Sequence, residues 1–302
     1  MMEKEYIQVS FENGNIERKS YPAGIRLLDL AKEYQKEDDI VLAKVNGRLR
    51  ELYLQLTEDC RISFITTRQQ EGMAAYRRSM TLLLLKALYH QAGHEHIRRV
   101  GIHFSVSSGY YCTVDGDVTL DQDFLDKVEA RMRELVAQKV PIDKKTIGTD
   151  DAIALFSQYG MKDKEKLFHY RRASKVNIYD MGGFEDYYYG YMVPDTSYLG
   201  AFSLHLYEDG FVLQMPEIDK PEIVPHFQAR TKFFQVMKES VKWGDIQEIE
   251  TVGGLNRNIT SGDVQETVLV QEAMQERRIA EIAQMIASRP EIRFVLIAGP
   301  SS

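Results

Sequence analysis

Cysteine is scarce in this chain of 302 residues, because Cys60 and Cys112 are the only two. Two thiols cannot form a disulfide framework or a four-cysteine metal site, so both of these kinds of small, cross-linked domain are excluded. Reduced thiols are typical of the cytoplasm, and we therefore predict a cytoplasmic protein.

The chain also lacks long apolar runs. The most apolar helical stretch, Leu82–Leu85, is far shorter than the roughly 20 residues that a transmembrane helix requires. Three of the first six residues are charged and no apolar core follows them, which is not the pattern of a signal peptide. We therefore expect no membrane as a partner.

An excess of positive charge is missing as well. The 38 basic residues are outnumbered by 45 acidic ones, which gives a net charge of −7. This balance argues against a protein that coats nucleic acid, although it allows a local basic site. The length predicts about two domains on the usual prior of roughly 100–200 residues each.

The segment 5–67 has the pattern of a small α+β domain. Residues 6–11 alternate between apolar and polar side chains, and Asn13-Gly14 is a strong hairpin signal. The other expected elements are a strand at 16–21, a helix at 27–34, and strands at 41–45 and 61–66. This order predicts a ubiquitin-like (β-grasp) fold.

The segment 72–215 mixes helices and strands. A long apolar helix is expected at 73–92, and Asp121 is placed to cap a second helix whose apolar residues recur at helical spacing. Further helices are expected at 151–158 and 162–171, and strands at 101–106, 110–114, 175–179, 198–206 and 211–215. The three prolines within 216–225 indicate a linker.

The last third of the chain is expected to be mainly helical. We predict helices at 227–243 and 261–288, separated by a turn-rich segment at 246–258, with Ser261 and Asp263 as candidate caps. The end, Phe294–Ser302, is an apolar run followed by Gly299, Pro300, Ser301 and Ser302. This is how a phosphate-binding P-loop begins, although an ordinary final strand has the same pattern. We expect the chain to be the N-terminal part of a longer protein, without the P-loop lysine.

Several blocks in the first 215 residues resemble threonyl-tRNA synthetases. They include Lys44-Val45-Asn46-Gly47, Tyr76-Arg77, Ser108-Gly109-Tyr110-Tyr111, Glu129-Ala130-Arg131-Met132 and Val193-Pro194-Asp195. The resemblance implies an α+β protein with a TGS domain of the β-grasp type at 1–70 and a mixed α+β editing-like domain at 71–217. A second resemblance, described below, implies that residues 218–302 are a helical lead-in to an absent P-loop kinase domain.

The resemblance also implies a pocket that has lost its chemistry. The family's editing site uses H-x-x-x-H and C-x-x-x-H, whose side chains can hold Zn²⁺ or activate a water. The corresponding positions here are Arg78, Leu82, Tyr188 and Met192, and none of these can replace a His or Cys as the ligand or base of that site. Gly109, Tyr110 and Asp186 match the pattern. We therefore predict a degenerate pocket with no catalytic residue and no metal.

The last third resembles a different family. The segments from Leu255-Asn256, through Ile279-Ala280-Glu281-Ile282-Ala283, to the end are similar to the lead-in of bacterial uridine kinases and phosphoribulokinases. This resemblance implies that the parent protein is a uridine or nucleoside kinase, with ATP, Mg²⁺ and a nucleoside bound beyond this inactive part. The 302 residues themselves would bind no cofactor, and would regulate or assemble the kinase.

Three smaller patterns leave alternatives open. Arg77, Arg78, Arg98 and Arg99 form a locally basic segment, either an RNA contact or solvated surface. His90, His94 and His96 are either metal ligands or the solvated end of a helix that Gly93 terminates. The tyrosines of 187–191 either stack on a base or fill the emptied pocket.

The main expectation is therefore a non-catalytic region of a nucleoside kinase. The first alternative is a stand-alone module that binds RNA or tRNA weakly, or a small molecule in the pocket. The second is a free-standing hydrolase of mischarged tRNA, against which the missing ligands argue.

Overall fold

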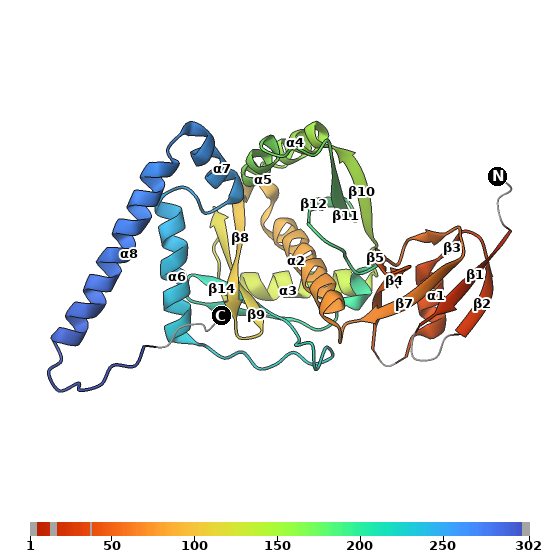
Figure 1. Ribbon diagram of the computed structural model, residues 1–302, viewed down its shortest axis with the longest axis horizontal. Coiled ribbons are helices and arrows are strands. Elements are labelled where there is room, and N and C mark those ends of the chain that lie inside the picture. The colour runs from red at the N-terminus through yellow and green to blue at the C-terminus, as the bar shows by residue number, and fades with distance from the viewer. Residues whose placement is uncertain (1–4, 13–16, 37, 298–302) are drawn as a thin grey trace.

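We analysed a computed structural model of the chain, which describes residues 5–12, 17–36 and 38–297. It is an α+β protein in three consecutive parts, which run from right to left in Figure 1. The N-terminal domain lies at one end, a larger mixed domain lies in the middle, and three helices form the other end. The α+β fold class predicted from the sequence is confirmed.

The N-terminal domain is a five-stranded sheet with one helix. Its strands have the order β2-β1-β7-β4-β5, and only the central pair β1 and β7 is parallel. The elements are β1 (Tyr6–Phe11), β2 (Glu17–Pro22), β3 (Ile25–Arg26), α1 (Leu27–Tyr34), β4 (Ile40–Val45), β5 (Arg48–Glu51), β6 (Gln55–Leu56) and β7 (Cys60–Thr66). This is the arrangement expected of a β-grasp domain.

The expected alternation decides which face of β1 is buried. Ile7, Val9 and Phe11 are buried and Gln8 is exposed, because successive side chains of a strand point to opposite faces. Helix α1 covers this face with its own buried leucines, which belong to the same apolar cluster. The expected Asn13-Gly14 turn lies outside the described residues.

Helix α2 (Gln70–Ala92) runs through the middle of the second domain (Figure 1). It is buried nearly all round, as its continuous apolar sequence requires. Its first turns also share a buried cluster with Val41, Leu42 and Ile65 of the N-terminal domain, so the two domains pack against each other. The helix ends where expected, at Gly93, whose φ is 89°.

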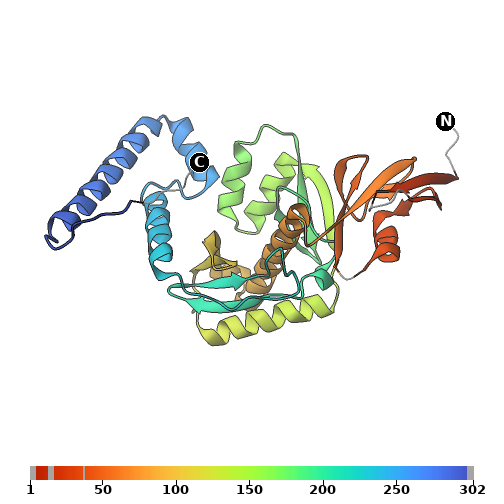
Figure 2. The same ribbon diagram turned by 60° about the horizontal axis from the view of Figure 1, so that its bottom comes forward.

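Two antiparallel sheets flank α2. One has the order β13-β14-β9-β8 and the other β10-β11-β12. Helix α3 packs on α2 and β13 (Figure 2), and α4 and α5 pack on each other beside the smaller sheet. The bounds are β8 (Ile97–Val106), β9 (Gly109–Gly116), α3 (Gln122–Ala137), β10 (Ile142–Gly148), α4 (Thr149–Gln158), α5 (Lys162–His169), β11 (Lys175–Met181), β12 (Phe184–Tyr187), β13 (Ser203–Tyr207) and β14 (Gly210–Gln214), with 3-10 turns η1 (His94–His96) and η2 (Thr196–Tyr198).

The last part consists of α6 (Thr231–Ile246), α7 (Val252–Ser261) and α8 (Val264–Ala287). Phe234 anchors α6 to the larger sheet, where its ring makes an edge contact with Tyr111 at 4.8 Å between centroids. Helix α8 leans away from the body of the molecule (Figure 1) and has no buried residue.

Two local expectations in this part were wrong, and a third needs a small change of bounds. The segment expected to be turn-rich contains α7, because Gly253 and Gly254 allow it to pack closely on α5 and on the backbone of Glu248. The helix expected at 261–288 is present as α8, but Gly262, with φ of 92°, ends α7, so α8 begins at Val264 with the candidate cap Asp263 at its N-cap position. The described residues of the expected final strand, 294–297, form no strand and are exposed.

Candidate ligand-binding site

A cavity with a volume of about 790 Å³ opens beside α2, in the region of the predicted pocket. One wall is α2, the opposite wall is β12 with the segment that follows it, and the third is formed by β8 and β9. Four of the seven predicted pocket residues line it, namely Arg78, Tyr110, Asp186 and Tyr188. The RNA candidate Arg77 lines it too.

The other three predicted pocket residues lie behind the wall. Leu82 and Met192 are buried in the core, and the hydroxyl of Ser79 lies 3.2 Å from Met192 Sδ. Gly109 is a close-packing position, because a Cβ there would lie 2.3 Å from the carbonyl oxygen of Leu213 on the paired strand β14. These apolar and small residues therefore shape the cavity without facing a ligand.

Two neighbouring arginines on α2 give the cavity its charge. Arg78 Nη1 donates a hydrogen bond of 2.9 Å to the carbonyl oxygen of Tyr191. Arg77 Nε is buried and has no hydrogen-bond partner among the residues that the structure describes. Within the same described ranges, neither guanidinium forms an ion pair with a carboxylate. Two unpaired cations in a cavity wall are a feature of anion-binding sites.

Asp186 is the one carboxylate among the residues described as lining the cavity, and it is already neutralised. Its side chain is 1% exposed and accepts a hydrogen bond from the ammonium of Lys164 on α5. The backbone N–H of Tyr187 also donates to it, at 2.6 Å. Burial raises the pKa of the Asp186 carboxyl, and the charge of Lys164 opposes this shift without reversing it.

Aromatic rings supply much of the remaining surface. Tyr110, Tyr187 and Tyr188 line the cavity, whereas Tyr189 is 86% exposed on the outside. Burial raises the pKa of Tyr188 well above its usual value, so its hydroxyl stays neutral. His103 also lines the cavity, and its Nε2 lies 2.8 Å from Thr113 Oγ1. Burial and the nearby charge of Arg99 lower the pKa of this imidazole.

Four residues stand at the positions that the resemblance to editing domains assigns to His and Cys. They are an arginine, a leucine, a tyrosine and a methionine. Among the described ranges, no cluster of three His, Cys, Asp or Glu side chains could hold a metal ion. His103 is the only imidazole among the described lining residues, and its lowered pKa keeps it neutral.

The structure divides the predicted basic segment. Arg77 and Arg78 face the cavity, whereas Arg98 is exposed on β8. Arg99 is compensated by Asp115 and Glu250, each at 3.3 Å. The four arginines therefore do not form one surface.

The other candidate groups lie away from the cavity. His90 and His96 are exposed, and the His94 ring stacks on Tyr89 with 4.6 Å between centroids. Cys112 is fully buried, and burial raises the pKa of its thiol to about 12. The P-loop candidates Gly299, Pro300, Ser301 and Ser302 lie outside the described residues.

Lys164 and His103 are cavity residues that the sequence pattern did not reveal. Lys164 lies in a charged helix with no motif around it, and Asp186 is 22 residues away in the sequence. His103 lies on β8, where nothing in its neighbours distinguishes it from any other strand residue. No local signal could have identified either.

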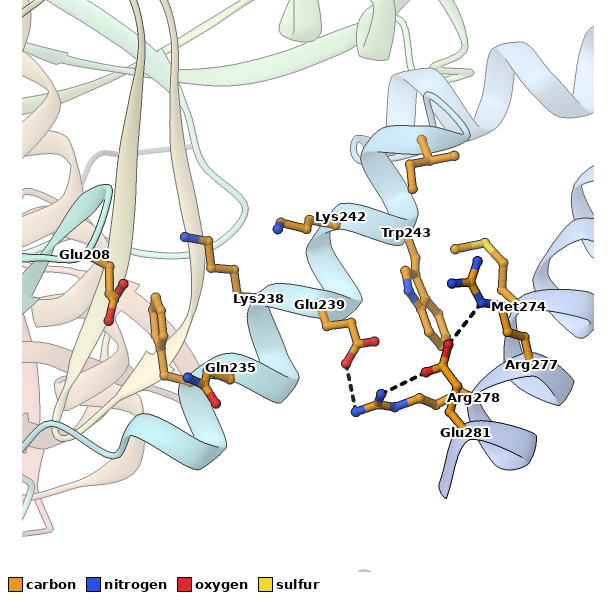
Figure 3. A pocket seen from close by; sticks show the side chains of 12 residues that line it. Glu208, Gln235, Lys238, Glu239, Lys242, Trp243, Met274, Arg277, Arg278 and Glu281 are labelled. Atoms are coloured by element: carbon orange, nitrogen blue, oxygen red, sulfur yellow. Dashed lines mark hydrogen bonds and ion pairs between the residues drawn. The ribbon is translucent and has the colours of Figure 1, made fainter. Parts of the chain in front are cut away.

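A second cavity, of about 620 Å³, separates α6 from α8 (Figure 3). Its charges are largely paired with each other, because Arg278 contacts Glu239 at 3.2 Å and Glu281 at 3.1 Å. Arg277 also contacts Glu281, at 3.0 Å. This ion-pair network ties α8 to α6 beside Trp243, so the cavity is less suited to an anion than the one beside α2.

Comparison with known proteins gives one consistent result. No protein-family model matches the chain. The threonine–tRNA ligase of Citrifermentans bemidjiense is 32% identical over 203 residues, which are 66% of this chain and 31% of the ligase. That of Pelobacter propionicus is 32% identical over 167 residues (54% and 25%), and that of Geobacillus kaustophilus 28% over 203 residues (66% and 30%). The matched part of the chain thus spans about a quarter to a third of the length of these relatives.

These relatives overturn the kinase interpretation. We expected the main function to be that of a non-catalytic region of a uridine or nucleoside kinase. This prediction was wrong, because the relatives found are threonine–tRNA ligases. A nucleoside and ATP as partners find no support, and Mg²⁺ stays an untested expectation. Among the described residues, no helix is long and apolar enough to cross a membrane. Across 66% of its length, this chain is similar in sequence to threonine–tRNA ligases.

Proposed function

We propose that the chain is an RNA-binding module that holds tRNA at the cavity beside α2 without hydrolysing it. The observation that carries this proposal is the pair Arg77 and Arg78, two cavity arginines without a carboxylate partner among the described residues. A protein with a net charge of −7 has few such places where a polyanion is attracted. The relatives, which by name join threonine to tRNA, support tRNA as the RNA.

The aromatic walls support the same proposal. Tyr110 and Tyr188 line the cavity, and stacking of an unstacked base on an aromatic ring contributes about 1–3 kcal/mol per base. Arg78 is held in place by the Tyr191 carbonyl, so little side-chain freedom is lost when it contacts a phosphate. The missing His and Cys side chains favour binding over ester hydrolysis.

The test is a titration of fluorescently labelled tRNA with the whole chain at several salt concentrations. We expect weak binding that falls steeply with salt, because phosphate contacts release bound cations. Arg77→Met keeps an apolar stem of similar length but removes the charge. This substitution should weaken tRNA binding about tenfold. It should also make the negative slope of log K against log salt shallower by about 1.

Arg98→Met is the matched control, because Arg98 is an arginine of the same basic segment that lies outside the cavity. It should bind tRNA as the unchanged chain does. Equal losses in both variants would show general surface attraction and would refute a cavity site. No binding at low salt would remove the proposal altogether.

A further inference from the structure

We infer that the cavity beside α2 is built for a terminal phosphomonoester, with Arg77 and Arg78 as the groups that hold the phosphate. The inference deepens the proposed function by naming the chemical group that the cavity takes. A free nucleoside monophosphate and an RNA with a terminal phosphate share this group.

The charge of the cavity matches a doubly charged anion. Its described lining residues include three cations, Arg77, Arg78 and Lys164, but only one carboxylate, Asp186. Lys164 and Asp186 form an ion pair with each other, so both arginines remain for a ligand. A phosphomonoester carries about −1.5 to −2 at pH 7, whereas an internal phosphodiester carries a single charge. The surplus positive charge of the cavity therefore fits the terminal phosphate of a nucleotide or RNA better than an internal phosphodiester of RNA.

Arg78 is set in one orientation before any ligand binds. Gly190 lies so close to its guanidinium that a Cβ at that position would be 2.5 Å from Arg78 Cζ. On the same segment, the Tyr191 carbonyl accepts the hydrogen bond from Nη1. The guanidinium is thus fixed between α2 and the segment after β12. Such preorganisation is what bidentate phosphate recognition uses.

Arg77 supplies a donor that is still unsatisfied. Its Nε is buried and lacks an acceptor among the described residues. Because Nε is closed off, a ligand would meet Arg77 through the outer nitrogens of the guanidinium that lines the cavity. No carboxylate among the described residues pairs with this charge, so the guanidinium remains for an anion.

The cavity is larger than a phosphate alone. Its volume of about 790 Å³ is within the range of roughly 300–1,000 Å³ typical of small-molecule sites. Tyr110, Tyr188 and the apolar side chain of Ile102 line the rest of it. These groups suit the base and sugar of a nucleotide, which would enter with the phosphate toward α2.

The experiment compares adenosine 5′-monophosphate, its singly charged methyl ester and adenosine by isothermal titration calorimetry with the whole chain. We expect the monophosphate to bind at least tenfold more tightly than the methyl ester, and adenosine to bind most weakly. Arg77→Met should reduce the preference for the monophosphate to below twofold, whereas Arg98→Met should leave it unchanged. Circular dichroism would establish that both variants are folded.

A second arm uses a 12-nucleotide RNA with either a 5′-phosphate or a 5′-hydroxyl. We expect the phosphorylated RNA to bind several-fold more tightly, and the difference to disappear in Arg77→Met. If tRNA and both RNAs bind equally well and the monophosphate shows no preference, the inference fails while the proposed function stands. If the monophosphate binds through Arg77 but no RNA does, the inference stands and the proposed function fails.

Discussion

The Glu51 Oε1 atom of the N-terminal domain lies 2.6 Å from the hydroxyl oxygen of Tyr179 in the second domain. The same carboxylate accepts hydrogen bonds from the backbone N–H of Met192 at 3.2 Å and from Lys144 Nζ at 3.0 Å. The Tyr179 hydroxyl also lies 2.5 Å from the carbonyl oxygen of Gly190. One side chain of the first domain therefore holds the segment that fixes Arg78 in the cavity.

Replacing Glu51 with alanine should loosen this connection. The side chain is 17% exposed, and its loss leaves Lys144 and the Met192 N–H short of an acceptor, whereas Tyr179 keeps the Gly190 carbonyl. We expect the free energy of unfolding to fall by about 1–3 kcal/mol, as when buried donors lose their partner. Urea denaturation followed by circular dichroism would measure it.

Glu12→Ala is the control for this change. Glu12 contacts Arg61 at 3.6 Å on the surface of the same domain, and such pairs contribute about 0–1 kcal/mol. A Glu51→Ala protein as stable as Glu12→Ala would show that the contact between the domains does not depend on Glu51.

Lys164→Met should have a larger effect, and one that depends on pH. It leaves the Asp186 carboxylate buried without its cation, which costs about 3–5 kcal/mol when the partner stays charged. Without Lys164, the already raised pKa of Asp186 should rise further. The carboxyl then protonates in the folded state at a higher pH than in the unfolded chain.

The sign of this pH dependence follows from linkage. A raised pKa in the folded state means that the folded variant binds a proton which the unfolded chain has lost, so the variant loses stability as pH rises. The difference in unfolding free energy between Lys164→Met and the unchanged chain should therefore shrink from pH 8 to pH 5. Thermal unfolding at a series of pH values tests this, and Asp186→Asn in the Lys164→Met background should abolish the pH-dependent part.

Gly109→Ala should disrupt the pairing of β9 with β14. The added methyl group would lie 2.3 Å from the Leu213 carbonyl oxygen and 2.9 Å from Gln214 Cα, and neither backbone atom can move without shifting the strand. We expect a loss of about 2 kcal/mol or more. Gly200→Ala is the matched control, because its methyl group would meet no atom within 4 Å and should change stability by less than about 0.5 kcal/mol.

Cys112 should be inert in the folded protein. Its side chain is fully buried, and a pKa of about 12 leaves very little thiolate at pH 8. Iodoacetamide at pH 8 should leave Cys112 unmodified under native conditions and modify it completely in urea, as read by mass spectrometry. Modification of native Cys112 as fast as that of a free peptide thiol would contradict the burial.

Some features could be read from the sequence because they depend on nearby residues. The alternation of Tyr6–Phe11 predicted which face of β1 is buried. Asp121 was expected to cap α3, and its side chain does accept a hydrogen bond from the Phe124 N–H at 2.9 Å. Capping and strand alternation act over a few residues, which is why these predictions could be made without the fold.

Other predictions failed because packing between distant segments prevailed over local signals. Gly253 and Gly254 are typical of a turn, but they lie inside α7, where their lack of side chains permits close packing on α5. Leu82 and Met192 were assigned to the pocket by their place in a motif, but their apolar side chains turn into the core. A motif gives a position in the chain, while burial decides which side chains face the cavity.

The sequence by itself determined which residue types stand at the positions that the resemblance assigns to hydrolysis, and arginine, leucine, tyrosine and methionine cannot do the work of His and Cys. The tertiary structure alone decided that Asp186 is neutralised by Lys164 and that Arg77 and Arg78 have no carboxylate partner among the described residues. The reason is physical. The charge available at a site depends on which opposite charges the fold brings within a few ångströms, and those come from separate elements of the chain.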